Sequence, residues 1–235
     1  MGAGRSGYRS AVPSRRFDGP CETDHYTDGE MPSEADLLAT LEEVVAVLED
    51  HDVDHVLMGG IGSFALARPR ETHDIDVFLR PGDVDPALDL LEQQGFEVSV
   101  HDPAWLAKAW KRGVLTDLVF RSSGEIYLDD EMIDRAERRD YKGVSALVIA
   151  PEDLVVIKAL ATAERTAHHW YDALAIMSRC EIDWDYLVRR AIQAGPRRVL
   201  SLLLYAESCD VAVPTTAVTA LHDTLHGSPA GSTVP

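Results

Sequence analysis

A double glycine between two short apolar segments constrains the fold of this chain more than any other feature. Residues 55–58 form an apolar run that ends at Gly59-Gly60, which predicts a buried strand followed by a tight turn. Residues 61–68 have a helical pattern, and residues 73–79 alternate and are rich in Ile, Val and Phe, which predicts a second strand. The segment therefore predicts a strand–turn–helix–strand unit inside an α/β core.

Two aspartates lie two positions apart on the second predicted strand. Asp74 and Asp76 flank Ile75, and because side chains alternate along a strand, both carboxylates face one side, with Cα atoms about 6.5 to 7 Å apart. Carboxylates on one face repel each other unless a cation lies between them, and Mg²⁺ prefers such oxygen ligands. Two ions about 3.5 to 4 Å apart are usual in nucleotidyl transfer. We therefore expect two Mg²⁺ ions here, with Mn²⁺ as a substitute.

Further polar groups are expected to converge on this site. Gly59-Gly60 leaves backbone N–H groups open where a helix begins, which suits phosphate binding, and Ser63 is placed to add a hydroxyl one turn later. Asp117 is the one ionisable residue in the apolar segment 114–120. If that segment is a strand beside the strand of the two aspartates, the Asp117 side chain comes within about 5 Å of them.

The spacing of these residues resembles the signature of the DNA polymerase β superfamily of nucleotidyltransferases. Thirteen residues separate Gly-Gly from Asp74-Ile-Asp76, and a later apolar strand carries one aspartate. The stretch Arg70-x-Thr72-x-Asp-Ile-Asp is similar to the bacterial stand-alone branch, which includes abortive-infection and toxin–antitoxin nucleotidyltransferases and the aminoglycoside and lincosamide nucleotidyltransferases. The resemblance covers about residues 55 to 180.

This resemblance implies an enzyme that moves an NMP from an NTP to an acceptor hydroxyl or phosphate and releases pyrophosphate. It also implies that a helix lysine and a later aspartate complete the nucleotide site. The family often has Lys-Asp-x-x-Asp in this last region, whereas the present chain has His-His-Trp-Tyr-Asp at 168–172. By role, the expected catalytic and metal-binding residues are Asp74, Asp76 and Asp117, and the expected nucleotide-binding residues are Gly59, Gly60, Ser63, Arg70, Thr72, Lys158 and Asp172.

Several of these residues also have purely structural interpretations. Arg70 and Thr72 are placed to cap the loop before the strand. Lys158 lies on a mostly apolar helix, from which a lysine can extend its ammonium group to solvent. His168 and His169 point about 100° apart on a helix, so they rarely bind one ion together, and we interpret them as structural. A basic cluster is interpreted as a solvated helix face, with a phosphate-rich acceptor as the alternative; it contains Arg135, Arg138, Arg139 and Lys142.

Two other functions are consistent with the same motifs. One is a toxin-like enzyme whose acceptor is RNA or a partner protein, and the other is a non-catalytic nucleotide-binding or antitoxin module of the same fold. Three intact carboxylates favour catalysis, because an inactive module gains nothing from their mutual repulsion. The sequence leaves open the acceptor, the preferred NTP, the oligomeric state and membership of a toxin–antitoxin pair.

The chain divides into four parts. Residues 1–32 have few large apolar side chains and are expected to be a disordered extension, so that Met31 could be the natural start. Residues 33–150 are expected to form the nucleotidyltransferase core, an α/β domain with a small mixed, mainly antiparallel sheet flanked by helices. Residues 104–112 are predicted as one of these helices. A helical C-terminal part is expected at 151–226, and a flexible tail at 227–235.

Charge and hydropathy exclude some functions. The chain has 40 acidic and 22 basic residues and a net charge of −18, which disfavours a general DNA-coating role. No apolar run reaches the 18 residues of a membrane span, and the first residues lack the apolar core of a signal peptide, so we expect a cytoplasmic protein. Residues 200–205 are too apolar for a free surface. They are expected to pack on the core or to form a homodimer contact.

Overall fold

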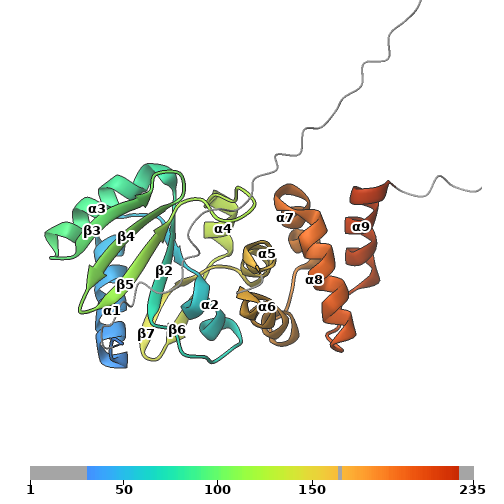
Figure 1. The fold of residues 1–235 in the computed structure, drawn as a ribbon, viewed down its shortest axis with the longest axis horizontal. Helices are drawn as coiled ribbons and strands as arrows, with labels where there is room; N and C mark the ends of the chain where they lie inside the picture. Colours follow the sequence, from blue (N-terminus) through green and yellow to red (C-terminus); the bar gives the residue numbers. More distant parts are fainter. Residues whose placement is uncertain (1–30, 164–165, 228–235) are drawn as a thin grey trace, which may run out of the picture. The chain divides into compact units, whose positions relative to one another are not determined.

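A seven-stranded mixed sheet is the centre of the part of the chain that the structure describes (Figure 1). This computed structural model describes residues 31–163 and 166–227. The predicted extension at 1–32 and the predicted tail at 227–235 therefore lie almost entirely outside the described residues. In spatial order the strands are β3 (Glu97–Asp102), β4 (Leu106–Lys111), β5 (Val114–Val119), β2 (Asp74–Leu79), β1 (His55–Leu57), β7 (Val144–Val148) and β6 (Glu137–Tyr141).

The strand β2 lies inside the sheet between two neighbours of different direction. It pairs with β5 in parallel and with β1 antiparallel. β1 in turn pairs with β7 in parallel, while β3–β4, β4–β5 and β6–β7 are antiparallel. This arrangement confirms the predicted mixed sheet, and it places β2 inside the sheet with a paired strand on each side.

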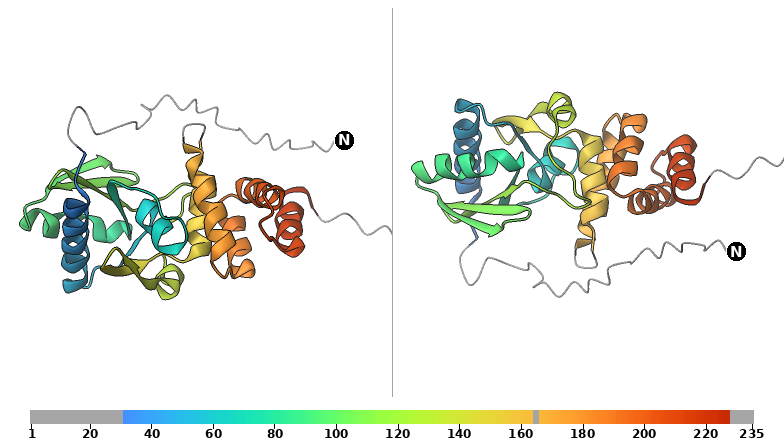
Figure 2. Two further views of the ribbon diagram at one scale, coloured as in Figure 1. Left: turned by 90° about the horizontal axis from the view of Figure 1, so that it is seen from below. Right: turned by 90° about the horizontal axis from the view of Figure 1, so that it is seen from above.

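The described residues contain nine α-helices, of which α7, α8 and α9 pack on other helices. Two of them, α1 and α3, cover one face, and the C-terminal helices α5 to α9 lie on the other side (Figures 1 and 2). The short helix α2 connects β1 to the loop before β2. The bounds are α1 Glu34–Asp50, α2 Gly59–Leu66, α3 Val84–Gln93, α4 Asp130–Arg135, α5 Pro151–Ala161, α6 His168–Arg179, α7 Trp184–Ala194, α8 Pro196–Ser208 and α9 Thr215–His226, with a 3-10 turn at Pro81–Asp83.

Alternation along the strands divides the interior into two apolar cores. Ile75 and Val77 belong to the core beneath α1 and α3, whereas Phe78 and Val119 belong to the core shared with the C-terminal helices. Since side chains two positions apart share a face, Asp76 lies on the face of Phe78. The carboxylates are therefore directed toward the C-terminal helices and away from α1.

A buried polar network joins α5 to α7. The Glu152 carboxylate accepts a hydrogen bond from the backbone N–H of Asp183 at 2.7 Å. The Asp153 carboxylate accepts from the Tyr186 hydroxyl at 2.7 Å and from Nε of Arg190 at 2.8 Å. Burial raises the pKa of Asp153 to about 6, although both partners favour its charged form. Buried carboxylates are stable only when their oxygens are bonded, so these contacts fix α7 against α5.

The helix predicted at residues 104–112 is wrong. This segment forms β4, which is paired along its length with β3 on one side and β5 on the other. Its composition, with two alanines, two lysines and a leucine, favours a helix locally. Two-sided strand pairing outweighs that local preference, because propensity is weak beside tertiary contacts.

The interpretation of the basic cluster as one solvated helix face is also wrong. Arg135 ends α4, whereas Arg138 and Arg139 lie on β6. The Arg138 guanidinium pairs with the Glu49 carboxylate at 2.7 Å, and Arg135 lies over the Tyr186 ring, 3.8 Å from its centroid. These arginines therefore connect elements of the fold.

The apolar segment of α8 packs inside the helical part. Leu202 and Leu203 are fully buried, in the core shared with α5 and α6, while Leu204 is 50% exposed and Tyr205 is 38% exposed. The homodimer stays a prediction. None of the helices within the described residues combines the length and the apolar character needed to cross a membrane.

Candidate active site

Two strands bring three aspartates to the same face of the sheet. Asp74 and Asp76 lie at the start of β2, and Asp117 lies in the middle of β5. In the parallel register, Asp76 is paired with Asp117, and Asp74 is paired with Leu115. The strand β5, which carries Asp117, is therefore the neighbour of β2, which carries Asp74 and Asp76. This is the condition under which the three carboxylates were predicted to lie close together.

The double glycine is packed directly against this carboxylate row. A Cβ atom added to Gly59 would lie 1.6 Å from Oδ2 of Asp76, and one added to Gly60 would lie 2.2 Å from Oγ1 of Thr72. The backbone N–H of Gly60 points at Oδ2 of Asp76, at 3.4 Å. Only glycine allows so close an approach, so the start of α2 and the start of β2 form one structural unit.

We expect Gly59→Ala to disrupt this unit. Gly59 has a φ of +59°, which for alanine costs about 1–2 kcal/mol, and the new methyl group would also displace the Asp76 carboxylate. Gly95→Ala is the matched control, because Gly95 has a φ of +81° but nothing within 4 Å of an added Cβ. In thermal melts both variants should lose stability from strain. Only Gly59→Ala should also lose the rise in Tm on addition of Mg²⁺ and NTP, and an equal rise in both would contradict the packing argument.

The loop before β2 positions the first aspartate. The Thr72 hydroxyl donates a hydrogen bond to Oδ1 of Asp74 at 2.7 Å, and the Thr72 side chain is buried. Ser63 is also buried, and its hydroxyl donates to the carbonyl oxygen of Gly59 at 2.7 Å. In this conformation both hydroxyls hold neighbouring groups of the site in place. Contact of either with a phosphate stays a prediction.

The charges of the three aspartates affect one another. Burial, followed by the charges of Asp74 and Asp117, raises the pKa of Asp76 from 3.8 to about 7. A bound cation would remove this cost, and Asp74 and Asp76 provide the oxygen ligands that Mg²⁺ prefers. Among the described residues, however, no three Asp, Glu, His or Cys side chains already form a metal-binding group. The two β2 aspartates thus fit a divalent cation, while Asp117 is paired with Lys108 at 3.2 Å.

A second charged cluster lies beside the aspartates, where α5 and α6 meet the loop that follows α2. Asp172 of α6 is fully buried, and Nζ of Lys158, which is 2% exposed, donates to its Oδ2 at 2.8 Å. Nη1 of Arg68 lies 2.5 Å from Oδ1 of Asp172, and Nη2 of Arg70 lies 3.3 Å from Oδ2. Lys158 is therefore buried in an ion pair, so the structural interpretation in which its ammonium group extends to solvent is wrong.

Electrostatics explain why this cluster is charged. Burial by itself would raise the pKa of Asp172, but Lys158, Arg68 and Arg70 outweigh burial and hold that pKa at about 2. Burial lowers the pKa of Lys158, and Asp172 opposes this effect. With three cations around one carboxylate, the cluster has a net positive charge. The nucleotide-binding role of Arg70 and Lys158 stays a prediction.

The two adjacent histidines of α6 border this cluster. Burial, followed by the charges of Lys158 and His168, lowers the pKa of His169 to about 3. Nδ1 of His169 is buried and has no hydrogen-bond partner among the described residues. The pKa of His168 is lowered as well, by burial and then by Arg70, so burial and the neighbouring cations together disfavour the protonated form of both rings.

Sequence reasoning missed two basic residues of the site, Arg68 and Lys108. Arg68 precedes the quoted Arg-x-Thr-x-Asp stretch by two positions, a spacing that was visible in the sequence. Lys108 lies in the segment that was assigned to a helix, so its strand partner could not be identified.

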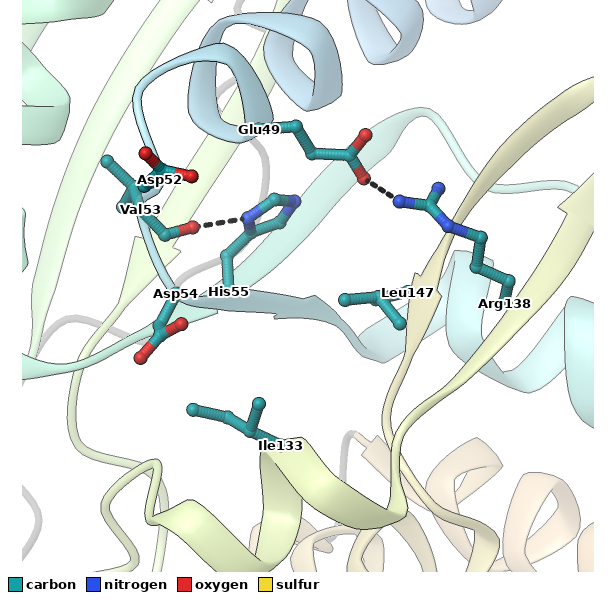
Figure 3. A pocket seen from close by; sticks show the side chains of 8 residues that line it. All are labelled: Glu49, Asp52, Val53, Asp54, His55, Ile133, Arg138 and Leu147. Carbon is teal, nitrogen blue, oxygen red and sulfur yellow. Dashed lines mark hydrogen bonds and ion pairs between the residues drawn. The ribbon is translucent and has the colours of Figure 1, made fainter.

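A cavity of about 230 Å³ lies away from the aspartates, between the end of α1, β1, α4 and β6 (Figure 3). It contains His55, which is paired with Leu79 at the far end of β2 from Asp74. Its walls carry the Glu49–Arg138 ion pair, and Nδ1 of His55 lies 2.8 Å from the carbonyl oxygen of Val53 (Figure 3). The cavity shares no residue with the site described above.

The fold and the aspartate-bearing strands are consistent with the polymerase β-like nucleotidyltransferase superfamily that the sequence resembles. The chain belongs to the family described as nucleotidyl transferases of unknown function, DUF2204, whose sequence profile matches residues 37–204. No curated protein matches the chain.

Several solved structures resemble the chain. One is the lincomycin-bound lincosamide antibiotic adenylyltransferase LnuA, with 18% identity, a TM-score of 0.45 and coverage of 63% of this chain and 99% of that one. The antibiotic-resistance factor ANT(2'')-Ia has 13% identity, a TM-score of 0.49 and coverage of 83% and 100%. An antigenic nucleotidyltransferase-like protein from Paracoccidioides brasiliensis has 14% identity, a TM-score of 0.46 and coverage of 80% and 98%.

Proposed function

We propose that this nucleotidyltransferase transfers an NMP from an NTP to an acceptor hydroxyl or phosphate, with Asp74 and Asp76 at the reacting phosphorus. One observation carries the proposal: Gly59 is packed on Asp76, and Asp76 is in register with Asp117. A phosphate group held by the glycine turn would therefore lie directly beside the carboxylate row.

In this proposal each group of the chain has a separate task. The backbone N–H groups at the start of α2 hold the phosphates, and Arg70 and Lys158 balance their negative charge. The acceptor oxygen attacks the α-phosphorus, the bond from that phosphorus to the bridging oxygen breaks, and pyrophosphate leaves. Asp117 faces the row from β5 and helps to activate the acceptor by taking its proton.

The β2 aspartates fit Mg²⁺ or Mn²⁺. Such a cation, when bound by Asp74 and Asp76, neutralises charge on the transferred phosphoryl group and lowers the pKa of the attacking oxygen. The observation in support is that burial of Asp76, together with repulsion by Asp74 and Asp117, raises the pKa of Asp76. The second ion that the sequence predicts would require Asp117 as a ligand.

A transfer assay tests the proposal. The protein is incubated with Mg²⁺ or Mn²⁺, with each α-labelled NTP in turn, and with total RNA, tRNA, lysate protein or an aminoglycoside. We expect label to move to one acceptor class and to require the divalent ion. Labelled RNA or protein would favour the toxin-like form of the enzyme. Tight NTP binding without labelling of any acceptor would favour the non-catalytic nucleotide-binding module instead.

A further inference from the structure

A buried lysine faces the third aspartate of the site. Lys108 lies on β4 and is 2% exposed, and its Nζ lies 3.2 Å from Oδ1 of Asp117. The antiparallel register pairs Lys108 with Asp117, and the parallel register pairs Asp117 with Asp76. Three neighbouring strands therefore place two carboxylates and one ammonium group in a single row.

The stability of the sheet does not require this ion pair. Taking a lysine and an aspartate out of water costs several kcal/mol per ion, and an apolar pair of similar volume is often as stable or more so. The neighbours of Lys108 on β4, Leu106, Ala107 and Ala109, are buried apolar residues. A buried positive charge at this position of β4 is therefore better explained by the charge of the site than by packing.

The charge balance indicates what the lysine replaces. Asp74 lies beside this row on β2; together the three aspartates contribute −3 and Lys108 contributes +1, so these four groups carry −3 + 1 = −2. Without nucleotide, one divalent cation is enough to neutralise this charge. For a second cation to bind Asp117, it would have to displace an ammonium group that is already buried against that carboxylate.

We propose that Lys108 is a positioning residue whose ammonium group holds Asp117 toward Asp76 and takes the place of the second divalent ion, so that the site binds one metal ion. This inference rests on the proposed function, since it assumes that Asp74 and Asp76 bind a divalent cation with the NTP. The sequence predicts two metal ions at this site. In this proposal the site holds one metal ion, and the Lys108 ammonium group takes the place of the other.

Metal stoichiometry tests this inference independently of activity. The full chain is dialysed to equilibrium against Mn²⁺ and a non-hydrolysable α,β-methylene NTP, and bound Mn²⁺ and bound nucleotide are both measured. We expect about one Mn²⁺ per nucleotide for the wild type and for Lys108→Arg, which keeps the cation. We expect about two for Lys108→Met, in which the ammonium group beside Asp117 is removed. Thermal melts establish that each variant is folded.

The wild-type ratio is decisive even if Lys108→Met does not fold. A ratio of two in the wild type would overturn the inference while leaving the proposed function intact. A ratio of one in a folded Lys108→Met would also overturn it, because loss of the ammonium group would then admit no second ion. Bound nucleotide with no bound Mn²⁺ would overturn both the inference and the proposed metal site.

Discussion

Replacing Asp76 by asparagine is expected to reduce nucleotide transfer by at least about 100-fold, because misplacement of a reacting group by about 1 Å already costs on that order. Asp76 lies at the centre of the site, with the Gly60 N–H and the Asp74 and Asp117 charges around it. Asparagine keeps an oxygen for the Gly60 N–H but loses the charge that a cation requires. The variant should therefore fold and yet fail to transfer label from an α-labelled NTP.

The same substitution should leave the metal-free protein as stable as the parent, or more stable. It removes a carboxylate that is disfavoured by burial and by two like charges, and sites of this kind commonly sacrifice stability for function. Mg²⁺ with NTP should raise the Tm of the parent by mass action, and that of Asp76→Asn far less. Asp85→Asn, at an exposed position on α3, is the control and should respond like the parent. Equal ligand stabilisation of Asp76→Asn and the parent would show that the ligand binds elsewhere.

Neighbouring carboxylates should behave as one unit in this assay. Asp74→Asn and Asp117→Asn are each expected to abolish transfer, and combining either with Asp76→Asn should add little, since residues that act together are far from additive.

The part of the site that the sequence predicted is the part encoded by local spacing. Gly59, Gly60, Asp74 and Asp76 lie within eighteen consecutive residues, and one strand–turn–helix–strand unit fixes their positions. Because side chains alternate between the two faces of a strand, their spacing of two residues was enough to place both β2 aspartates on one face. The structure adds the reason for the glycines, which is the contact of each with a side chain of the following loop or strand.

The remainder of the site depends on contacts between segments that are distant in the sequence. Lys108 approaches Asp117 only because β4 pairs with β5, and the local composition of that segment favours a helix. Likewise, Arg68 and Asp172 are 104 positions apart, and their contact depends on how α6 packs near the start of β2. No local pattern carries this information, so the predicted nucleotide-binding role of Asp172 could be stated only by resemblance.

Asp172→Asn is expected to be among the most destabilising single substitutions in the chain. The carboxylate is fully buried and compensates Lys158, which is 2% exposed. Removing one partner of a buried pair costs about 3–5 kcal/mol, because the other charge stays buried without compensation. Denaturant unfolding of the purified variant against the parent measures this loss. A loss below about 1 kcal/mol would mean that another group, such as Asp76, compensates the buried Lys158 without Asp172.

The pH dependence of the parent should show the same contribution. The pKa of Asp172 in the folded protein, about 2, lies below its ordinary value of 3.8. A carboxylate with a lowered pKa contributes stability above its unfolded-state pKa, and this contribution is lost as the pH falls through the folded-state pKa. Between pH 4 and pH 2 the parent should therefore lose its advantage over Asp172→Asn. A constant difference across this range would assign the destabilisation to another cause.

A double variant separates the structural role of this pair from its role in the reaction. Lys158→Met combined with Asp172→Leu replaces the buried pair by apolar side chains of similar volume, a change that is often neutral or stabilising. Arg68 and Arg70 are 33% and 25% exposed, so water can solvate them once their partner is gone. The double variant should thus regain most of the stability that Asp172→Asn loses. If Lys158 contacts the nucleotide, transfer should nevertheless stay low and NTP affinity should fall. If transfer and NTP affinity instead recover together with stability, the Lys158–Asp172 pair is purely structural.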